Sequence, residues 1–250
     1  MHEWYYEMIF KRKSFHRFSG TSLLSGDEIK EIQNHIQCLQ PLMDGIRTEF
    51  RLVPREGTTC KRGHYCILIY SEVKEHHLLN VGYMGQQLDL WLASKNIGAC
   101  WYGMGRTHEK QHNGLDFVIM IAIEKADEKD FRKDYTKAKR KELSEIWMGN
   151  AYQKMGSVAR YAPSACNTQP WLAMCEKNQL HLYRVKGKKG MMPKDKVTYY
   201  NKIDMGIFML FLELCLEHEK ISYVRKLYPD TLEDKEKILT AAYFMATEGE

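Results

Sequence analysis

Two long apolar stretches, each led by a Met-Gly pair, constrain the fold most strongly. YMG (83–85) and DMG (204–206) place these pairs 121 residues apart (206 − 85 = 121), and each is expected to open a long apolar helix. The apolar runs FVIMIAI (117–123) and AAYFMAT (241–247) recur at a similar distance. A period this long does not suit a stack of short repeats. The chain is therefore expected to hold two copies of one unit that meet through these helices, unless the alternation of helices and strands is a coincidence.

The order of predicted elements is similar in both parts. The capping-box spacing of SGDE (25–28) predicts a helix over 26–40. The rest of the first part predicts strands at 48–53, 65–70, 99–102 and 117–123, and a helix over 82–97 closed by Gly98. The second part predicts helices over 144–161 and 204–218, and strands at 170–175, 180–185 and 241–247. We expect an α+β fold of two tandem repeats (about 1–143 and about 144–250) with mostly antiparallel central sheets flanked by helices. The repeats form one domain (1–250), because no Pro/Gly-rich linker divides them.

The charge and the cysteines limit the class of protein. The net charge of +5 includes basic runs at 132–141 and 186–190, which suit an anionic small molecule and do not require nucleic acid. The most apolar stretch (206–216) is too short for a bilayer and contains Glu213, and the first residues do not form a signal peptide. The seven cysteines are expected to be reduced, and CKRGHYC (60–66) lacks the spacing of a zinc site. We therefore expect a cytoplasmic protein that binds neither membrane, nucleic acid nor metal.

The stretch KRKSFHRF (11–18) carries many hydrogen-bond donors at the end of a short helix. An arginine offers a planar fork of donors for a phosphate or a pair of carbonyls, and a serine adds a short hydroxyl. Cations at a helix C-terminus also complement its dipole without binding a ligand. The candidate binding residues of this stretch are Arg12, Lys13, Ser14 and His16, with Arg17 beside them.

A second polar stretch, RYAPSACNTQPW (160–171), lies between a predicted helix and a predicted strand. Together the two stretches resemble the nitroreductase family of FMN-dependent oxidoreductases. Residues 12–18 are similar to the family motif Arg-Arg-Ser-x-Arg-x-Phe. Residues 162–171 match every specified position of Ala-Pro-Ser-x-x-Asn-x-Gln-Pro-Trp. A looser signature, a Gly-led helix followed by a Gly-rich strand start, is similar to residues 85–103.

The placement of the motifs departs from the family pattern. Ordinary members carry both motifs in one unit, and two identical chains build two flavin sites. Here the first motif occurs only in the first half, which has PLMDGIRTE (41–49) where the second motif is expected; the second half lacks the first motif near 133–135. The resemblance implies a nitroreductase-like fold in which the repeats form a fused pseudo-dimer with one FMN site, similar to an internally duplicated subgroup. Such a chain is expected to be a monomer or a weak homodimer.

The resemblance also implies roles for individual residues. Arg12, Lys13 and Ser14 are expected to contact the phosphate or the pyrimidine edge of FMN. His16 replaces a usual Arg or Lys, so it implies weaker or differently tuned binding. The opposite edge is assigned to Pro163, Ser164, Asn167 and Gln169. Backbone near flavin N5 is assigned to Gly103, Met104 and Gly105, and further phosphate contacts to Lys139 and Arg140. A plain turn and a solvated basic surface remain the alternatives for these last two groups.

The implied reaction is ping-pong hydride transfer, in which NAD(P)H reduces FMN and a nitroaromatic, quinone or similar electrophile reoxidises it. The flavin carries the chemistry, so no catalytic residue is assigned, and His76, His77, His108 and His112 are expected to be surface residues and not catalysts. One alternative is a protein that binds or stores FMN without turnover. Another is a member with an empty site that acts through protein contacts. The sequence does not decide between NADH and NADPH.

Overall fold

The computed structural model describes residues 3–20, 22–185, 192–230 and 236–246. Its helices are α1 (Trp4–Lys11), α2 (Gly26–Ile36), α3 (His77–Ser94), α4 (Leu143–Ile146), α5 (Gln153–Ala159) and α6 (Val197–His218). The first sheet contains β1 (Thr48–Pro54), β2 (Tyr65–Ser71), β3 (Ile97–Tyr102), β4 (Gln111–His112) and β5 (Leu115–Lys125). The second contains β6 (Trp147–Met148), β7 (Trp171–Glu176), β8 (Gln179–Val185), β9 (Tyr223–Leu227) and β10 (Lys237–Met245). None of the helices within the described ranges is long and apolar enough to cross a bilayer.

The two sheets share one connectivity. The first has the strand order β1-β2-β5-β3, and four strands of the second have the order β7-β8-β10-β9. When the two-residue strands β4 and β6 are set aside, the third strand along the chain (β3 or β9) lies at the edge of its sheet, next to the fourth (β5 or β10). Long helices connect the second and third strands, α3 in the first unit and α6 in the second. The ladders are antiparallel, except that the short β6 pairs with β7 in parallel. The predicted α+β class with antiparallel-rich sheets is confirmed.

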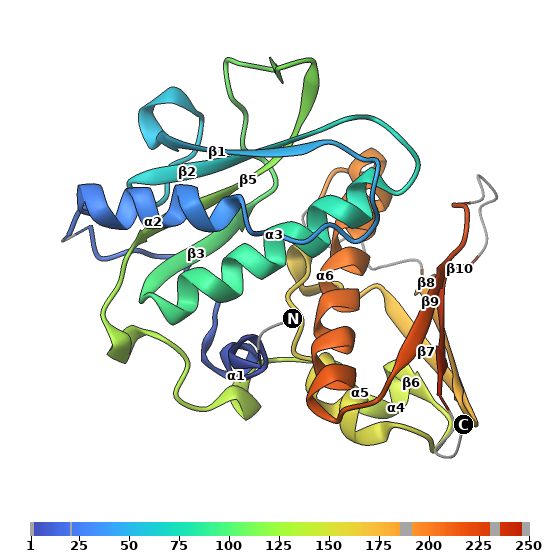
Figure 1. Cartoon of the computed structure of the whole chain (residues 1–250). Coiled ribbons are helices and arrows are strands. Elements are labelled where there is room, and N and C mark those ends of the chain that lie inside the picture. Colours follow the sequence, from blue (N-terminus) through green and yellow to red (C-terminus); the bar gives the residue numbers. More distant parts are fainter. Residues whose placement is uncertain (1–2, 21, 186–191, 231–235, 247–250) are drawn as a thin grey trace.

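The two long helices pack against each other between the sheets (Figure 1). Their backbones touch at two glycines. A Cβ atom added to Gly82 would lie 2.0 Å from the carbonyl oxygen of Ile203, and one added to Gly206 would lie 1.9 Å from that of Leu79. Both glycines and their contacts are offset by the same number of residues (206 − 82 = 203 − 79 = 124). The contact is thus reciprocal, as at a two-fold interface.

A buried carboxylate ties the same two helices to the second sheet. Glu213 on α6 accepts hydrogen bonds of 2.8 Å from the hydroxyls of Tyr83 on α3 and Tyr243 on β10. Arg225 on β9 places its Nη1 2.6 Å from Glu213 Oε1. An ionised carboxylate in a protein interior is tolerated only with such partners. The network therefore fixes α3 and α6 against the same strands.

Several sequence predictions need correction. The Met-Gly pairs do not open the long helices, which begin earlier, at His77 and Val197. The predicted helix 82–97 ends at Ser94, because Asn96 is left-handed (φ 56°) and Gly98 already belongs to β3.

The predicted helix 144–161 is also wrong, because it is divided into α4, β6 and α5. Gly149 has φ 93° and Tyr152 has φ 56°, and Trp147 with Met148 pairs with β7. Strand β9 was not predicted, because an edge strand with charged residues has little apolar signal.

The other predicted helices and strands are confirmed, with shifts at their ends. The last strand ends at Met245, and both residue 247 and the basic run at 186–190 lie outside the described residues.

The helix contact generates a stability prediction. Gly82→Ala should lower the free energy of unfolding by about 3 kcal/mol through overpacking, more than the roughly 1 kcal/mol that alanine gains over glycine inside a helix. The control is Gly26→Ala at the start of α2, where an added Cβ meets nothing within 4 Å. Urea unfolding of both variants measures the difference. Equal stability of the two variants would contradict the close contact.

Candidate functional site

The edge of the first sheet positions Arg12, which follows the end of α1. Ser14 forms a bridge with Ala99 on β3, and the amide of Phe15 donates to the Ala99 carbonyl (3.0 Å). The Arg12 side chain is consequently almost fully buried, with 1% of its surface exposed. Its Nη2 lies 3.2 Å from Asp89 Oδ2 on α3 and donates to Ser14 Oγ, also at 3.2 Å. Asp89 therefore holds the first predicted arginine in place.

Three arginines gather at this position, and we call Arg12, Arg132 and Arg140 the arginine cluster. The backbone carries Arg132 to the site, since its amide donates to the Lys11 carbonyl (3.0 Å). Burial, followed by the charge of Arg12, lowers the pKa of both Arg132 and Arg140 to about 10. Like charges that repel one another inside a protein require a compensating anion.

The arginine cluster also contains hydrogen-bond donors that have no acceptor among the described residues. Arg12 Nε, Arg132 Nη1 and Arg140 Nε are buried and have no hydrogen-bond partner within the described ranges. Buried polar groups in proteins are nearly always satisfied, so each of these atoms points to a missing acceptor. A phosphate, with several anionic oxygens, is the group that several guanidinium donors match best.

The second predicted motif forms a tight loop before β7. Cys166, Asn167 and Gln169 all have left-handed backbones, with φ of 50°, 55° and 48°. Such conformations are strained for residues other than glycine and asparagine, and they cluster at binding sites. Two contacts hold the loop: Asp204 Oδ1 on α6 accepts from the Ala165 amide (2.9 Å), and Ser164 Oγ accepts from the Gln169 amide (2.9 Å).

This loop is joined to the arginine cluster. Arg140 donates from Nη1 to Asn167 Oδ1 (3.1 Å) and from Nη2 to the Tyr161 carbonyl (3.0 Å). Asn167 Nδ2 donates to the carbonyl of Lys139 (3.1 Å), while the amide of Lys141 donates to Gln169 Oε1 (2.8 Å). The structure thus brings residues 139–141 and the loop together beside Arg12, which is far away in sequence. Gln169 and Pro163 are buried, and the Gln169 amide group is used inside the loop.

Other predicted residues lie beside this arrangement. Lys13 places its Nζ over the ring of Phe15, 4.7 Å from the ring centre, and the Lys139 side chain is exposed. His16 is exposed, with Nδ1 3.2 Å from Arg62 Nη1. Partial burial and the charges of Arg62 and Arg12 lower the pKa of His16, so its imidazole is neutral at pH 7.

The glycines after β3 face the start of α6. The Tyr200 hydroxyl donates to the Gly103 carbonyl, and a Cβ on Gly103 would lie 3.0 Å from the Tyr200 ring. A Cβ on Gly105 would lie 2.6 Å from Met120 Sδ, and the Gly105 amide donates to the Tyr102 carbonyl (3.1 Å). The amides of Gly103 and Met104 have no acceptor among the described residues, while the Met104 side chain is exposed.

Sequence reasoning did not single out four residues that shape this site: Arg132, Asp89, Asp204 and Tyr200. Arg132 lies in the basic run at 132–141, which suits an anionic small molecule but does not distinguish one cation from its neighbours. Asp89 and Asp204 left a usable signal, since each is a carboxylate in a helix that is otherwise mostly apolar. A buried carboxylate must have a partner, so these positions pointed towards Arg12 and the second motif.

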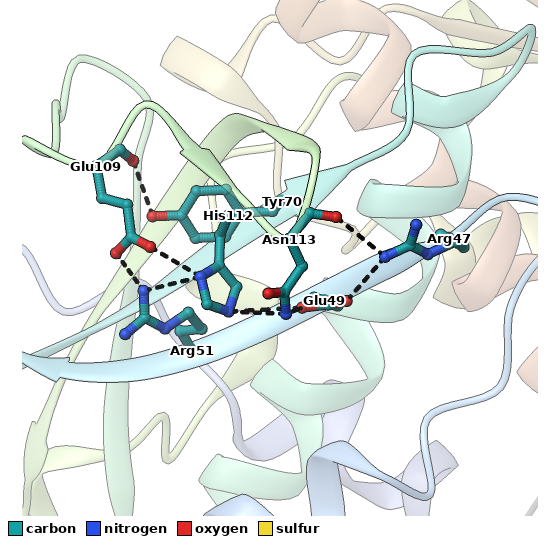
Figure 2. A network of polar contacts seen from close by, with 7 residues as sticks. All are labelled: Arg47, Glu49, Arg51, Tyr70, Glu109, His112 and Asn113. Carbon is teal, nitrogen blue, oxygen red and sulfur yellow. Dashed lines mark hydrogen bonds and ion pairs between the residues drawn. The ribbon is translucent and has the colours of Figure 1, made fainter.

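Figure 2 shows a separate polar network around His112 at the surface of the first sheet. His112 Nδ1 lies 2.8 Å from Glu109 Oε1 and its Nε2 lies 3.6 Å from Glu49 Oε2. Arg51 contacts Glu109, and Asn113 donates to Glu49 Oε2 (2.9 Å). Each of these charged groups has an opposite charge beside it, so the network ties the turn between β4 and β5 to β1. It lies outside the arginine cluster.

Comparison with known proteins agrees with this architecture. The family model described as "Putative TM nitroreductase" matches residues 5–215. A crystal structure described as a putative nitroreductase from Thermotoga maritima is 17% identical, with a TM-score of 0.62 over 96% of this chain and 92% of its own. No curated protein matches. The chain therefore belongs to the Putative TM nitroreductase family and has a nitroreductase-like fold, and this membership indicates an oxidoreductase.

Two further solved structures are similar over about half of the chain. A nitroreductase family protein from Clostridium novyi is 16% identical, with a TM-score of 0.40 over 49% of this chain and 85% of its own. A protein from Parabacteroides distasonis, described as a putative NADH dehydrogenase/NAD(P)H nitroreductase, is 15% identical. Its TM-score is 0.43 over 59% of this chain and 98% of its own.

The carboxylate that holds the loop generates a pH prediction. Burial raises the pKa of Asp204 from 3.8 to about 8, against the hydrogen bonds from Ala165 and Thr168 that lower it. The fold therefore favours the protonated acid, and this stabilisation is full below pH 3.8 and is lost as the pH rises to 8. Asp204→Asn removes this dependence of the stability on pH. Relative to wild type, its free energy of unfolding should rise by more than about 1 kcal/mol between pH 5 and pH 8.

Urea unfolding at the two pH values measures this change, with the exposed Asp195→Asn as the control. A constant difference between wild type and Asp204→Asn would mean that Asp204 is ionised throughout this range.

Proposed function

We propose that this protein is an FMN-dependent NAD(P)H oxidoreductase with one flavin site between its two halves. The observation that carries the proposal is the arginine cluster, whose unpartnered buried donors lie beside the loop at 162–171. This donor set fits a phosphomonoester, since its anionic oxygens would accept the spare hydrogen bonds and offset the mutual repulsion. Membership of the nitroreductase family supports FMN as the molecule that brings the phosphate.

The residues divide into those that bind and those that position. Arg12, Arg132 and Arg140 would hold the phosphate, with Asp89 fixing the orientation of Arg12. Asn167 is exposed at the end of the loop, and beside its bonds to Arg140 and Lys139 its amide group would offer the remaining N–H and oxygen lone pair to the pyrimidine edge. The free amides of Gly103 and Met104 would face the central ring. When bound, FMN supplies the redox chemistry, taking hydride from NAD(P)H and passing it to an acceptor such as a nitroaromatic or quinone.

We also propose that the two halves are copies of one unit, fused into a pseudo-dimer. The equal strand orders and the reciprocal Gly82 and Gly206 contacts support this interpretation. Strand β5 carries the run at 117–123 and β10 carries residues 241–245 of the second run, and the two runs start 124 residues apart (241 − 117 = 124). One chain then supplies both sides of the site, so the expected oligomeric state is a monomer.

The first prediction concerns the cofactor. Purified protein mixed with FMN should retain a flavin absorption band after gel filtration, and anaerobic NADH or NADPH should bleach it. Addition of a nitroaromatic or a quinone should then restore the band. A bound flavin that neither nucleotide reduces would instead indicate a protein that binds FMN without turnover. Absence of FMN binding would reject the proposal.

The second prediction separates binding from structure. Arg132→Met should weaken FMN binding about tenfold, because one charge-assisted contact is lost. The same change removes a repelling charge beside Arg12 and Arg140, so the FMN-free variant should be as stable as wild type or more stable. Lys133→Met, one residue away and exposed, is the matched control and should change neither property.

Titration of protein fluorescence with FMN and thermal unfolding without FMN measure the two effects. If Arg132→Met lowers stability and leaves FMN affinity intact, Arg132 is a structural residue. Arg12 is less suitable for this test, because its removal would leave Asp89 buried without its cation.

A further inference from the structure

A cavity of about 230 Å³ lies where the first turn of α3 meets the second sheet, away from both predicted motifs. Its lining comes from five parts of the chain and includes His76, Arg184, Lys202, Tyr228 and Asp230. None of these residues belongs to the arginine cluster or to the loop at 162–171. The end of α3 concerned is the one that points towards β8 and β10 in Figure 1. The volume is below the range typical of drug-sized ligands, so the cavity suits a small molecule.

Among the described residues, the charges that line the cavity do not balance: Arg184 is largely buried, whereas Lys202 and Asp230 are half-buried. Arg184 Nη2 lies 2.6 Å from Asp230 Oδ1, and Lys202 Nζ contacts the other oxygen of the same carboxylate. Burial opposes ionisation of Asp230, but these two cations prevail and hold its pKa below the ordinary value. Among the described lining residues, one carboxylate thus faces two cations, which leaves one positive charge. The other charged lining residues, Lys74 and Glu75, are exposed and of opposite sign.

The backbone adds to this positive field. The amides of Leu78 and Leu79, in the first turn of α3, have no hydrogen-bond acceptor among the described residues. Free amides at a helix N-terminus carry a partial positive charge. Leu78 and Leu79 line the same cavity as the surplus cation, so the helix terminus and the cation both favour an anion there.

The rest of the lining is largely apolar and limits which anion fits. Leu78 and Leu79 are buried beneath the cavity, and Ile238 and Leu239 line it from β10. An inorganic phosphate would leave most of its oxygens against hydrocarbon, which is costly. A carboxylate with a flat or short apolar body could place its two oxygens at Lys202 and cover the leucines with the remainder.

A comparison of the starts of α3 and α6 explains why this cavity exists beside the second sheet. Tyr200 and His76 lie near the starts of the two long helices with the same offset as the touching glycines (200 − 76 = 124). Tyr200 packs on Gly103, which follows β3, and thereby fills its space. His76 and Tyr228, which follows β9, line the cavity instead. By this offset, His76 and not a tyrosine stands at the position equivalent to Tyr200, and it lines the cavity.

We infer that this cavity is a second ligand site, which binds a small apolar carboxylate of about the size of benzoate. Lys202 and Arg184 bind the carboxylate, and Asp230 competes with it for the same cations. This site is separate from the proposed flavin site and requires no FMN.

The probe is 4-fluorobenzoate, followed by ¹⁹F NMR with the full chain at fixed pH and ionic strength. We expect saturable binding of one molecule per chain that an excess of inorganic phosphate does not displace. FMN should not displace it either. Displacement by FMN would place the probe in the flavin site, and non-saturable binding would mean that the cavity has no specific ligand of this class. Either result overturns the inference.

Two substitutions with opposite expected effects test the charges. Lys202→Met should weaken binding of the probe about tenfold, while Arg184 still compensates Asp230. Asp230→Asn removes the competing carboxylate and should strengthen binding several-fold. Lys194→Met, an exposed residue outside the cavity, is the control for loss of one positive charge. If the three residues serve only as a structural ion-pair group, Asp230→Asn will lower stability without strengthening binding, and the inference fails.

Discussion

The close approach of α3 and α6 is the constraint on which the rest of the structure depends. Gly82 and Gly206 let the two backbones touch where any side chain would collide with a carbonyl oxygen. This short separation brings the two sheets to opposite sides of one helix pair (Figure 1). It also sets the distance between Asp89 on α3, which holds Arg12, and Asp204 on α6, which holds the loop before β7.

The candidate site contains repelling cations and hydrogen-bond donors without acceptors, and a bound anion would relieve both. Three arginines repel one another, three of their donors lack acceptors, and the loop opposite them contains strained backbone at Cys166 and Gln169. A structure selected only for stability would avoid each of these features. Their concentration in one place supports the proposal that this site binds an anion. The carboxylates that position the site, Asp89 and Asp204, are buried and bonded to other residues of the chain, so their replacement is costly.

The two halves share one strand connectivity, but different features lie beside their sheets. On the side of the first sheet, Tyr200 closes the space beside Gly103, and the arginine cluster lies near the edge of that sheet. On the side of the second sheet, a cavity is lined by Arg184, Lys202 and Asp230. In the proposed pseudo-dimer one chain holds both halves, so each half can change without the other, which two identical subunits cannot do.

Sequence alone determined most of the secondary structure and the two motifs. Apolar runs such as 65–70 and 117–123 must be buried, and the capping box at Ser25 fixes the start of α2. It also indicated the family, because the motif at 162–171 is long and specific. Local patterns failed where a tertiary contact decided the conformation. Residues 144–161 have helical character, yet pairing of Trp147 with β7 and the turn at Gly149 divide them.

The tertiary structure alone decided which charged residues act together. Arg12, Arg132 and Arg140 are separated by up to 128 residues (140 − 12), and no local pattern distinguishes Arg132 from its exposed neighbour Lys133. Burial makes the difference, since a cation acquires a strong need for an anion only when water is removed from it. The sequence determines which groups can carry charge, and the fold determines which of them are left without a partner.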